Sequence, residues 1–388
     1  MSLFDMIEEQ GLTEEFNLMS KPTDPVWQGP CSADRNGGIT FSLLNKFLIC
    51  RERFRLYVVE GLREKDKFNH RLEYGNMWHL CEEYHDPSND DWKLHLKVYT
   101  DKLLEKYRLE REEIVKWYNV CLIQFETYIN YSKKNYKPSH KVVSRERVFC
   151  EPYTLPSGRI VYLRGKQDGA DLLKHETKPG LHTFIQENKT KGDIDAQALR
   201  RQLKFDLQTM LYVIAFKQSD LGRNSVYPFG GVVYNVIRRP LSGGKGTIVK
   251  HKPTKKNPSG ESWSEYFDRL RGIIDGTETE CSPGIEHFFM RWTIEISDED
   301  IKRFKSQCLD PLLENVCQWW EHVTDTASKG IYRSGGAYDI CPHWRHPYGV
   351  YNPLNEGDGT YLEDYINSGN DAGLMRTNNL FPELQEGI

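Results

Sequence analysis

No stretch of this 388-residue sequence is long and apolar enough to cross a membrane. The opening residues MSLFDMIEEQGL lack the basic flank and the apolar centre of a secretory signal. Nine cysteines, an odd number without regular spacing, do not suit a disulfide framework. No G-x-x-x-x-G-K-[ST] segment indicates a nucleotide site or a helicase. These absences predict a cytoplasmic globular protein without membrane contact.

Two kinds of apolar periodicity follow one another along the chain, one typical of helices and one typical of strands. The predicted helices cover residues 39–62, 70–84, 92–136 (one or two helices), 195–219, 262–274 and 297–323. The predicted strands cover residues 141–155, 159–176, 182–190 and 227–239, and a Pro-Ser-Gly turn joins the first two. This order predicts an α/β or α+β core that carries helical additions.

Composition divides the chain into three parts. Residues 1–38 are polar, end in a segment rich in Pro and Gly, and predict an extension with little core of its own. Residues 39–330 hold the predicted elements, with a helical insertion at about 92–136 and a basic loop at 238–256. Residues 331–388 are rich in Gly, Pro and aromatic residues and predict an irregular tail.

The net charge of −4 does not indicate a nucleic-acid partner, but residues 238–256 contain seven Lys and Arg and no acid. One interpretation is a solvated loop, and the other is a mobile arm that follows a phosphate backbone. The candidate contacts to nucleic acid are Arg238, Arg239, Lys245, Lys250, Lys252, Lys255 and Lys256.

A carboxylate and a lysine lie two residues apart in the strand-like segment FIQENKT. Glu187 and Lys189 therefore share a face of the strand, and Asp168 lies near the end of the preceding predicted strand. If these strands are neighbours, the two carboxylates converge and need a proton or a cation between them. Oxygen ligands of this type suit Mg²⁺ or Mn²⁺, and such a set serves phosphodiester hydrolysis. A solvated ion pair is the alternative, and Asp171 is a rival for Asp168.

Three short motifs occur in one order: Gly165-Lys166-Gln167-Asp168, then Glu187-Asn188-Lys189, then Gln208-Thr209-Met210-Leu211-Tyr212. This set resembles the PD-(D/E)xK nucleases, and more narrowly their RecB-type branch, which carries G-x-x-D, E-x-K and Q-x-x-x-Y. That branch includes CRISPR adaptation nucleases, AddAB and RecBCD nuclease domains and phage exonucleases. The resemblance covers about residues 39–235. It implies a restriction-endonuclease-like α/β core, with a mixed central sheet flanked by helices, within residues 39–330.

The resemblance also implies a metal site. Asp168, Glu187 and His79 would be ligands, and the backbone carbonyl of Asn188 would be a fourth. The implied cofactor is Mg²⁺ or Mn²⁺, and an imidazole ligand favours Mn²⁺. Taken alone, His79 is better explained as a core histidine on the apolar face of a helix.

Three further residues receive roles from the resemblance. Lys189 would position or activate the attacking water and stabilise the pentavalent phosphate. Gln208 and Tyr212 are four residues apart, on one face of a helix, and would line the active site. Tyr212 on an apolar stripe would otherwise be a core residue.

Some members of the branch bind a [4Fe–4S] cluster through one early cysteine and three cysteines near the C-terminus. Cys50 matches the first, but Cys308, Cys317 and Cys341 are scattered, so we do not expect an iron–sulfur cluster. Cys341 and the two histidines that follow it lie too close together, without a fourth ligand, to form a good zinc site.

The resemblance implies a metal-dependent DNA exonuclease in recombination, repair or phage DNA metabolism, with DNA as its partner, either single-stranded or with free ends. Its products would carry 5′-phosphate and 3′-hydroxyl ends. An endonuclease of the same superfamily, for defence or for branched DNA, is the alternative within enzymes. A DNA-end-binding adaptor with little cleavage is an alternative of another class. Processivity would have to come from a protein partner or a closed ring.

Overall fold

The computed structural model describes residues 25–64, 67–86, 89–135, 141–192, 194–240, 248–277, 284–328 and 374–384. Internal contacts divide the chain into two compact units. Unit 1 comprises Met1–Asp66, Cys150–Gly165 and Lys305–Ile388, and unit 2 comprises Lys67–Phe149 and Lys166–Phe304. None of the helices in the described ranges combines the length and apolarity that a membrane crossing needs.

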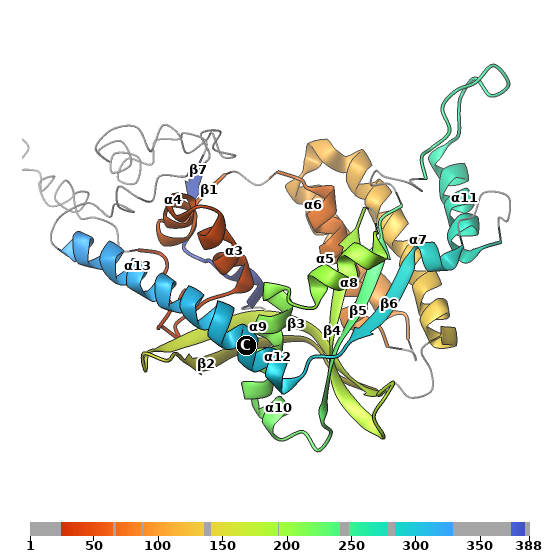
Figure 1. Cartoon of the computed structure of the whole chain (residues 1–388). Coiled ribbons are helices and arrows are strands. Elements are labelled where there is room, and N and C mark those ends of the chain that lie inside the picture. Colours follow the sequence, from red (N-terminus) through yellow and green to blue (C-terminus); the bar gives the residue numbers. More distant parts are fainter. Residues whose placement is uncertain are drawn as a thin grey trace, which may run out of the picture. The chain divides into compact units, whose positions relative to one another are not determined.

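A mixed sheet has five strands in the order β2-β3-β4-β5-β6 (Figure 1). It belongs to unit 2 except for the end of β2 and the start of β3, which fall within Cys150–Gly165 of unit 1. The strands are β2 (Lys141–Thr154), β3 (Ile160–Lys174), β4 (Leu181–Lys191), β5 (Phe229–Arg238) and β6 (Phe289–Ile294). β4 pairs with β3 and β6 pairs with β5 in antiparallel fashion, whereas β4 and β5 are parallel. The predicted mixed sheet flanked by helices is confirmed, and β6 is a strand that the sequence pattern did not reveal.

The connection between the parallel strands β4 and β5 is helical, as is usual for the crossover that a parallel pair requires. The single helix predicted for residues 195–219 is wrong, because the chain forms α8 (Ala196–Leu203) and α9 (Leu207–Gln218), followed by α10 (Asp220–Arg223). The carboxylate of Asp206 accepts a hydrogen bond from the backbone N–H of Thr209, which starts α9 anew. The bend therefore sets where the first turn of α9 lies.

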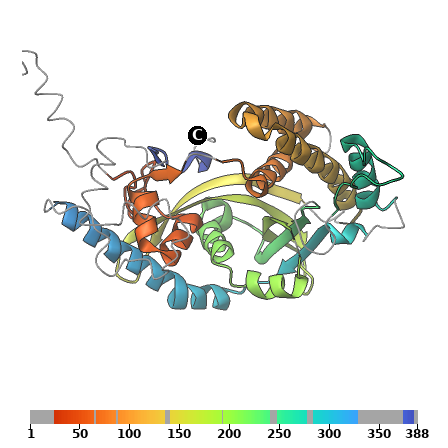
Figure 2. The same ribbon diagram turned by 90° about the horizontal axis from the view of Figure 1, so that it is seen from above.

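Helices cover both faces of the sheet (Figure 2), with α8 and α9 on one side and a helical layer on the other. This layer holds α5 (His70–Tyr84), α6 (Asp91–Lys106), the 3-10 turn η2 (Arg108–Glu110), α7 (Arg111–Asn135) and α11 (Trp263–Asp275). Its core contains Trp78, Trp92, Trp117 and Phe125, all at most 1% exposed. Trp78 and Trp117 are thus core residues. The unit also contains the turn η3 (Ile285–His287) and helix α12 (Asp298–Phe304), which begins at a capping box formed by Ser297 and Asp300.

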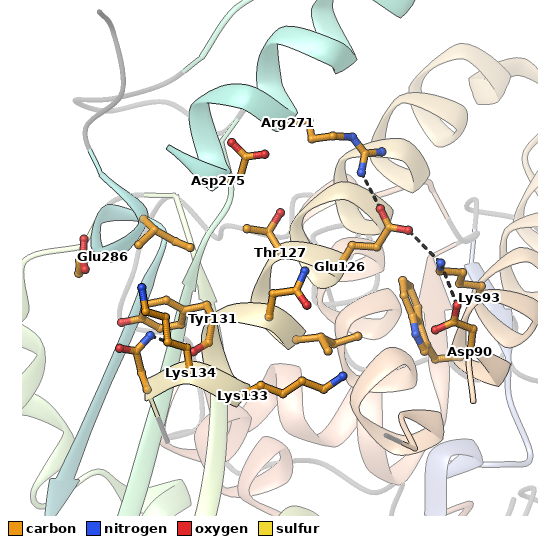
Figure 3. A pocket seen from close by; sticks show the side chains of 15 residues that line it. Asp90, Lys93, Glu126, Thr127, Tyr131, Lys133, Lys134, Arg271, Asp275 and Glu286 are labelled. Carbon is orange, nitrogen blue, oxygen red and sulfur yellow. Dashed lines mark hydrogen bonds and ion pairs between the residues drawn. The ribbon is translucent and has the colours of Figure 1, made fainter. Parts of the chain in front are cut away.

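Paired charges line a hollow of about 630 Å³ between α6, α7 and α11 (Figure 3). Lys93 lies 3.2 Å from Asp90 and 3.0 Å from Glu126, and Arg271 donates to Glu126 at 2.8 Å. Because Glu126 belongs to α7 and Arg271 to α11, these pairs connect neighbouring helices. The opposite charges compensate one another, so we assign this hollow a structural role.

Unit 1 has its own small aromatic core. Its α-helices are α3 (Phe41–Ile49), α4 (Arg51–Phe54) and α13 (Asp310–Ser328). Two short π-helical segments, η1 (Arg55–Val59) and η4 (Lys305–Leu309), adjoin them. Trp27 is fully buried against Phe54, so the end of the polar extension does contribute to a core. Thr40 caps α3. In the tail, β7 (Leu374–Arg376) pairs with β1 (Leu62–Glu64), and η6 (Pro382–Leu384) follows.

One ion pair lies deep in unit 2. Arg145 on β2 donates to Asp171 on β3 at 2.7 Å, and the Asp171 side chain is 0% exposed. Arg145 passes over Gly169, where a Cβ atom would come within 2.6 Å of the guanidinium. A side chain at position 169 would therefore displace Arg145 from its partner. Asp171, the rival for Asp168, thus has a structural partner of its own.

Removal of the Asp171 carboxylate should destabilise the fold, because it leaves the Arg145 guanidinium buried without its closest compensating charge. Asp171→Ala is expected to lower the free energy of unfolding by about 3–5 kcal/mol. Urea unfolding followed by circular dichroism measures this loss.

Asp101→Ala is the matched control, because Asp101 pairs with Lys97 on the surface of α6 and its side chain is 52% exposed. This control should unfold at the urea concentration of the wild type. An Asp171→Ala protein as stable as the control would show that the buried pair contributes nothing.

Candidate active site

The register between β3 and β4 brings two of the predicted residues together. At one end of the paired region Gly169 lies opposite Gln186. Asp168 and Glu187 are the next residues along β3 and β4 beyond this pair. The backbone N–H of Asn188 donates to Oδ2 of Asp168 at 2.6 Å. Asp168 is 8% exposed and Glu187 is 1% exposed. The two carboxylates therefore lie within the protein at one place in the sheet.

His79, on α5, faces the Asp168 carboxylate from the helical layer. Its Nδ1 atom lies 3.6 Å from Oδ1 of Asp168 and 3.2 Å from Oε1 of Glu146 on β2. One ligand atom from each of these three residues falls within 4.8 Å of the other two. The structure thus brings His79 and Asp168 together as expected and adds Glu146. Glu187 is not part of this closest trio.

Glu146 is the site residue that sequence reasoning missed. It lies in the segment RERVF, where Arg145 and Arg147 on either side suggest an ordinary charged edge strand. Its φ angle of 45° is the one positive value among the non-glycine residues in the described ranges. Backbone strain of this kind is typical of functional positions. Regular alternation along β2 could not have indicated that Glu146 joins His79, since a positive φ interrupts that alternation.

The cluster carries more negative than positive charge. Burial disfavours a charged His79, but Asp168 and Glu146 outweigh burial and raise the pKa of this imidazole to about 9. Burial raises the pKa of Asp168 to about 7, although the neighbouring His79 acts in the opposite direction. Lys166 compensates Glu146 from 3.1 Å and lies 3.5 Å from Glu83. A further cation would relieve the repulsion that remains among the carboxylates.

The ammonium of Lys189 stands between two oxygen acceptors. It donates to Oε1 of Glu187 at 2.5 Å and to Oε1 of Gln208 at 2.7 Å. Nε2 of Gln208 donates to the hydroxyl of Tyr212 at 3.4 Å, one helical turn further along α9. Burial opposes the charge on Lys189, but Glu187 outweighs burial and raises the lysine pKa, so the amine stays protonated at neutral pH. Hydrogen bonds thus connect Glu187, Lys189, Gln208 and Tyr212 in one row.

The side chain of Asn188 does not join this row. Its Oδ1 accepts from Gln186 at 3.1 Å and from Asn235 at 3.0 Å within the sheet. The backbone N–H of Asn188 holds Asp168, so the residue supports the site through its main chain. The predicted role of its carbonyl as a metal ligand stays a prediction.

The basic segment is not a single exposed arm. Arg238 ends β5 and is 3% exposed, and Arg239 is 9% exposed and donates to the carbonyl of Thr190 at 3.0 Å. The placement of these two arginines in an exposed arm was wrong, because Arg238 is the last residue of the interior strand β5 and Arg239 follows it directly. Lys252, Lys255 and Lys256 are exposed, Lys250 lies over the ring of Trp263, and Lys245 is outside the described residues.

The cysteines in the described ranges form no disulfide bond with one another. Cys50 and Cys317 are buried, and Cys308 is exposed. Cys341 and the histidines that follow it lie outside the described residues.

The donor set at the cluster fits one divalent cation. His79 offers an imidazole nitrogen, and Glu146 and Asp168 offer carboxylate oxygens, all from buried or half-buried positions. Carboxylate oxygens suit Mg²⁺, and the combination with one imidazole suits Mn²⁺ as well. Glu187 lies beside this trio and can add a further oxygen if Lys189 releases it.

The family model of the PD-(D/E)XK nuclease superfamily matches residues 39–286, which is more than half of the chain. None of the curated proteins matches the chain significantly. The matched range contains the cluster of His79, Glu146 and Asp168 and the row from Glu187 to Tyr212. The chain therefore belongs to the PD-(D/E)XK nuclease superfamily.

Proposed function

We propose that this chain is a Mg²⁺- or Mn²⁺-dependent DNA exonuclease of the RecB type, which acts in recombination, repair or phage DNA metabolism. Superfamily membership implies a metal-dependent nuclease activity. The observation that carries the proposal is the place of Lys189, whose ammonium contacts Glu187. Glu187 lies beside the cluster of two carboxylates and an imidazole that could hold a metal ion. Such a pairing of cation site and amine suits the negative charge that grows on a phosphate during hydrolysis.

The cluster would hold the cation through His79, Glu146 and Asp168, with Glu187 and the Asn188 carbonyl completing the set. A bound divalent cation supplies Lewis acidity toward the scissile phosphate and makes water a better nucleophile at neutral pH. The protein's own part is to keep the donors together. Asn188 does this for Asp168 through the hydrogen bond from its backbone.

The hydrogen-bonded row of Glu187, Lys189, Gln208 and Tyr212 would contact the phosphate. Lys189 donates hydrogen bonds to a phosphate oxygen, and Gln208 orients the ammonium from 2.7 Å. Burial raises the pKa of Tyr212 far above the neutral range, so its hydroxyl remains a hydrogen-bond donor. Gln208 and Tyr212 can therefore contact the substrate strand or its waters without changing charge.

Two observations support attack at ends over attack within a duplex. The helices α6 and α7 pack on α5, which carries His79, and form a layer beside the site. A layer in this place would restrict the approach of a continuous duplex. The order of motifs also resembles the RecB-type branch, in which exonucleases occur.

Removal of the Lys189 amine should abolish cleavage while the metal site persists. Lys189→Ala is expected to lower the rate of DNA hydrolysis by about 10²–10³-fold, because the developing phosphate charge loses its buried ammonium. Initial rates on end-labelled DNA with Mn²⁺ measure this, and circular dichroism checks the fold. Lys217→Ala removes a lysine from the far end of α9, where it pairs with the exposed Asp298, and should cleave normally. Full activity of Lys189→Ala would show that Lys189 takes no part in the chemistry.

Glu146 should contribute to cation binding as strongly as the residues that the motifs indicate. Glu146→Gln keeps the size of the side chain but removes its charge, so we expect at least a tenfold weaker affinity for Mn²⁺. Isothermal titration calorimetry of the protein with Mn²⁺ alone gives the affinity. Glu176→Gln, in an exposed loop after β3, is the matched control and should bind as the wild type does. Equal affinity of both variants would show that Glu146 is not a ligand.

Linear and closed circular DNA together distinguish an exonuclease, an endonuclease and an adaptor. Linear DNA should disappear with Mn²⁺ or Mg²⁺ and persist in EDTA, while closed circular DNA should remain intact under the same conditions. Labels at the 5′ or 3′ end then show the direction of digestion. Relaxation of circles would identify an endonuclease, and tight DNA binding without cleavage would identify an end-binding adaptor.

A further inference from the structure

The bend between α8 and α9 exposes an aromatic ring. Phe205 is 48% exposed, whereas Phe184 and Phe216 elsewhere in the same unit are at most 3% exposed. Among the described residues of α8, α9 and their bend, Phe205 is the one large apolar side chain that is exposed. A solitary ring is too small to form an apolar patch for a protein partner.

A residue of the sheet anchors the chain on both sides of Phe205. Tyr234 on β5 is fully buried, and its hydroxyl donates to the carbonyl of Leu203, the last residue of α8, at 3.0 Å. The same hydroxyl lies 2.5 Å from Oγ1 of Thr209 in the first turn of α9. One side chain of the sheet thus ties both helices on either side of the bend. The chain on both sides of Phe205 is therefore anchored to the sheet.

Positively charged side chains precede the ring in the chain. Residues 196–205 contain Arg200, Arg201 and Lys204 and no acid, and all three cations are exposed. The ammonium of Lys204 lies 5.5 Å from the centre of the Phe205 ring. Exposed cations beside an exposed ring suit a strand of nucleic acid, in which phosphates alternate with flat bases.

The ring lies close in the chain to the row that would handle the phosphate. Asp206 follows Phe205 and caps α9, and Gln208 in the first turn of that helix accepts from Lys189 at 2.7 Å. Only two residues, Asp206 and Leu207, therefore separate the exposed ring from a side chain that orients the ammonium. A strand that contacts Phe205 is near the candidate active site.

We propose that Phe205 stacks on an unpaired base of the substrate strand while Arg201 and Lys204 contact its phosphates. The inference rests on the proposed function only in taking DNA as the substrate. A base within a duplex is covered on both faces by its neighbours, whereas an unpaired base offers a free face to the ring. Phe205 would thereby make the protein prefer single-stranded DNA or frayed ends, and it acts as a positioning residue for the strand.

Binding of a single-stranded oligonucleotide in EDTA tests the proposal, because no cleavage takes place without metal. Phe205→Ala should bind between about 5-fold and 150-fold more weakly than the wild type in fluorescence anisotropy. Phe205→Trp should retain the affinity, since the indole also stacks. An oligonucleotide with 2-aminopurine should lose fluorescence on binding to the wild type and to Phe205→Trp, and lose less on binding to Phe205→Ala.

Tyr227→Ala is the matched control, because Tyr227 is 39% exposed and precedes β5 at the end of the strand away from Lys189. It should bind as the wild type does. Unchanged affinity and unchanged quenching in Phe205→Ala would overturn the proposal. An equal loss of affinity for blunt duplex DNA would also overturn it, because stacking on an unpaired base cannot explain it. Failure of the wild type to cleave any DNA would contradict the proposed nuclease function and leave this binding result to stand by itself.

Discussion

The candidate site depends on how buried negative charge is compensated. Asp168 and Glu187 lie at neighbouring positions of two strands, where few water molecules can screen their repulsion. His79, Lys166 and Lys189 each contact a carboxylate of the site and offset part of this charge. A divalent cation would carry out the same compensation more completely. The arrangement that stabilises the carboxylates without a metal is thus also the arrangement that would bind one.

The sheet and its two helical layers place these groups from different directions. The helix α5 supplies His79 from one face of the sheet, while the restart of α9 after Asp206 supplies Gln208 from the other. The buried hydroxyl of Tyr234 holds that restart in place. Because the same bend exposes Phe205, one local feature of the chain both orients Lys189 and presents a ring to solvent.

Much of the fold could be predicted from the sequence, because periodicity and motif spacing are local properties. The bounds of α5 at His70 and Tyr84 and the shared face of Glu187 and Lys189 follow directly from them. Other features depend on interactions that spacing does not encode. Glu146 joins the cluster through an unusual backbone angle, and a single capping carboxylate at Asp206 divides what looked like one helix. Arg238 looked like the start of a mobile arm, but its burial is decided by the pairing of β5.

The central claim is that one divalent cation binds among His79, Glu146 and Asp168, with Lys189 beside it and not bound to it. Anomalous diffraction from crystals soaked in Mn²⁺ locates the ion directly. The account predicts one strong peak within coordination distance of those three side chains, with the Lys189 amine free to contact a phosphate. A peak elsewhere, or none at a Mn²⁺ concentration that supports DNA cleavage, would contradict it.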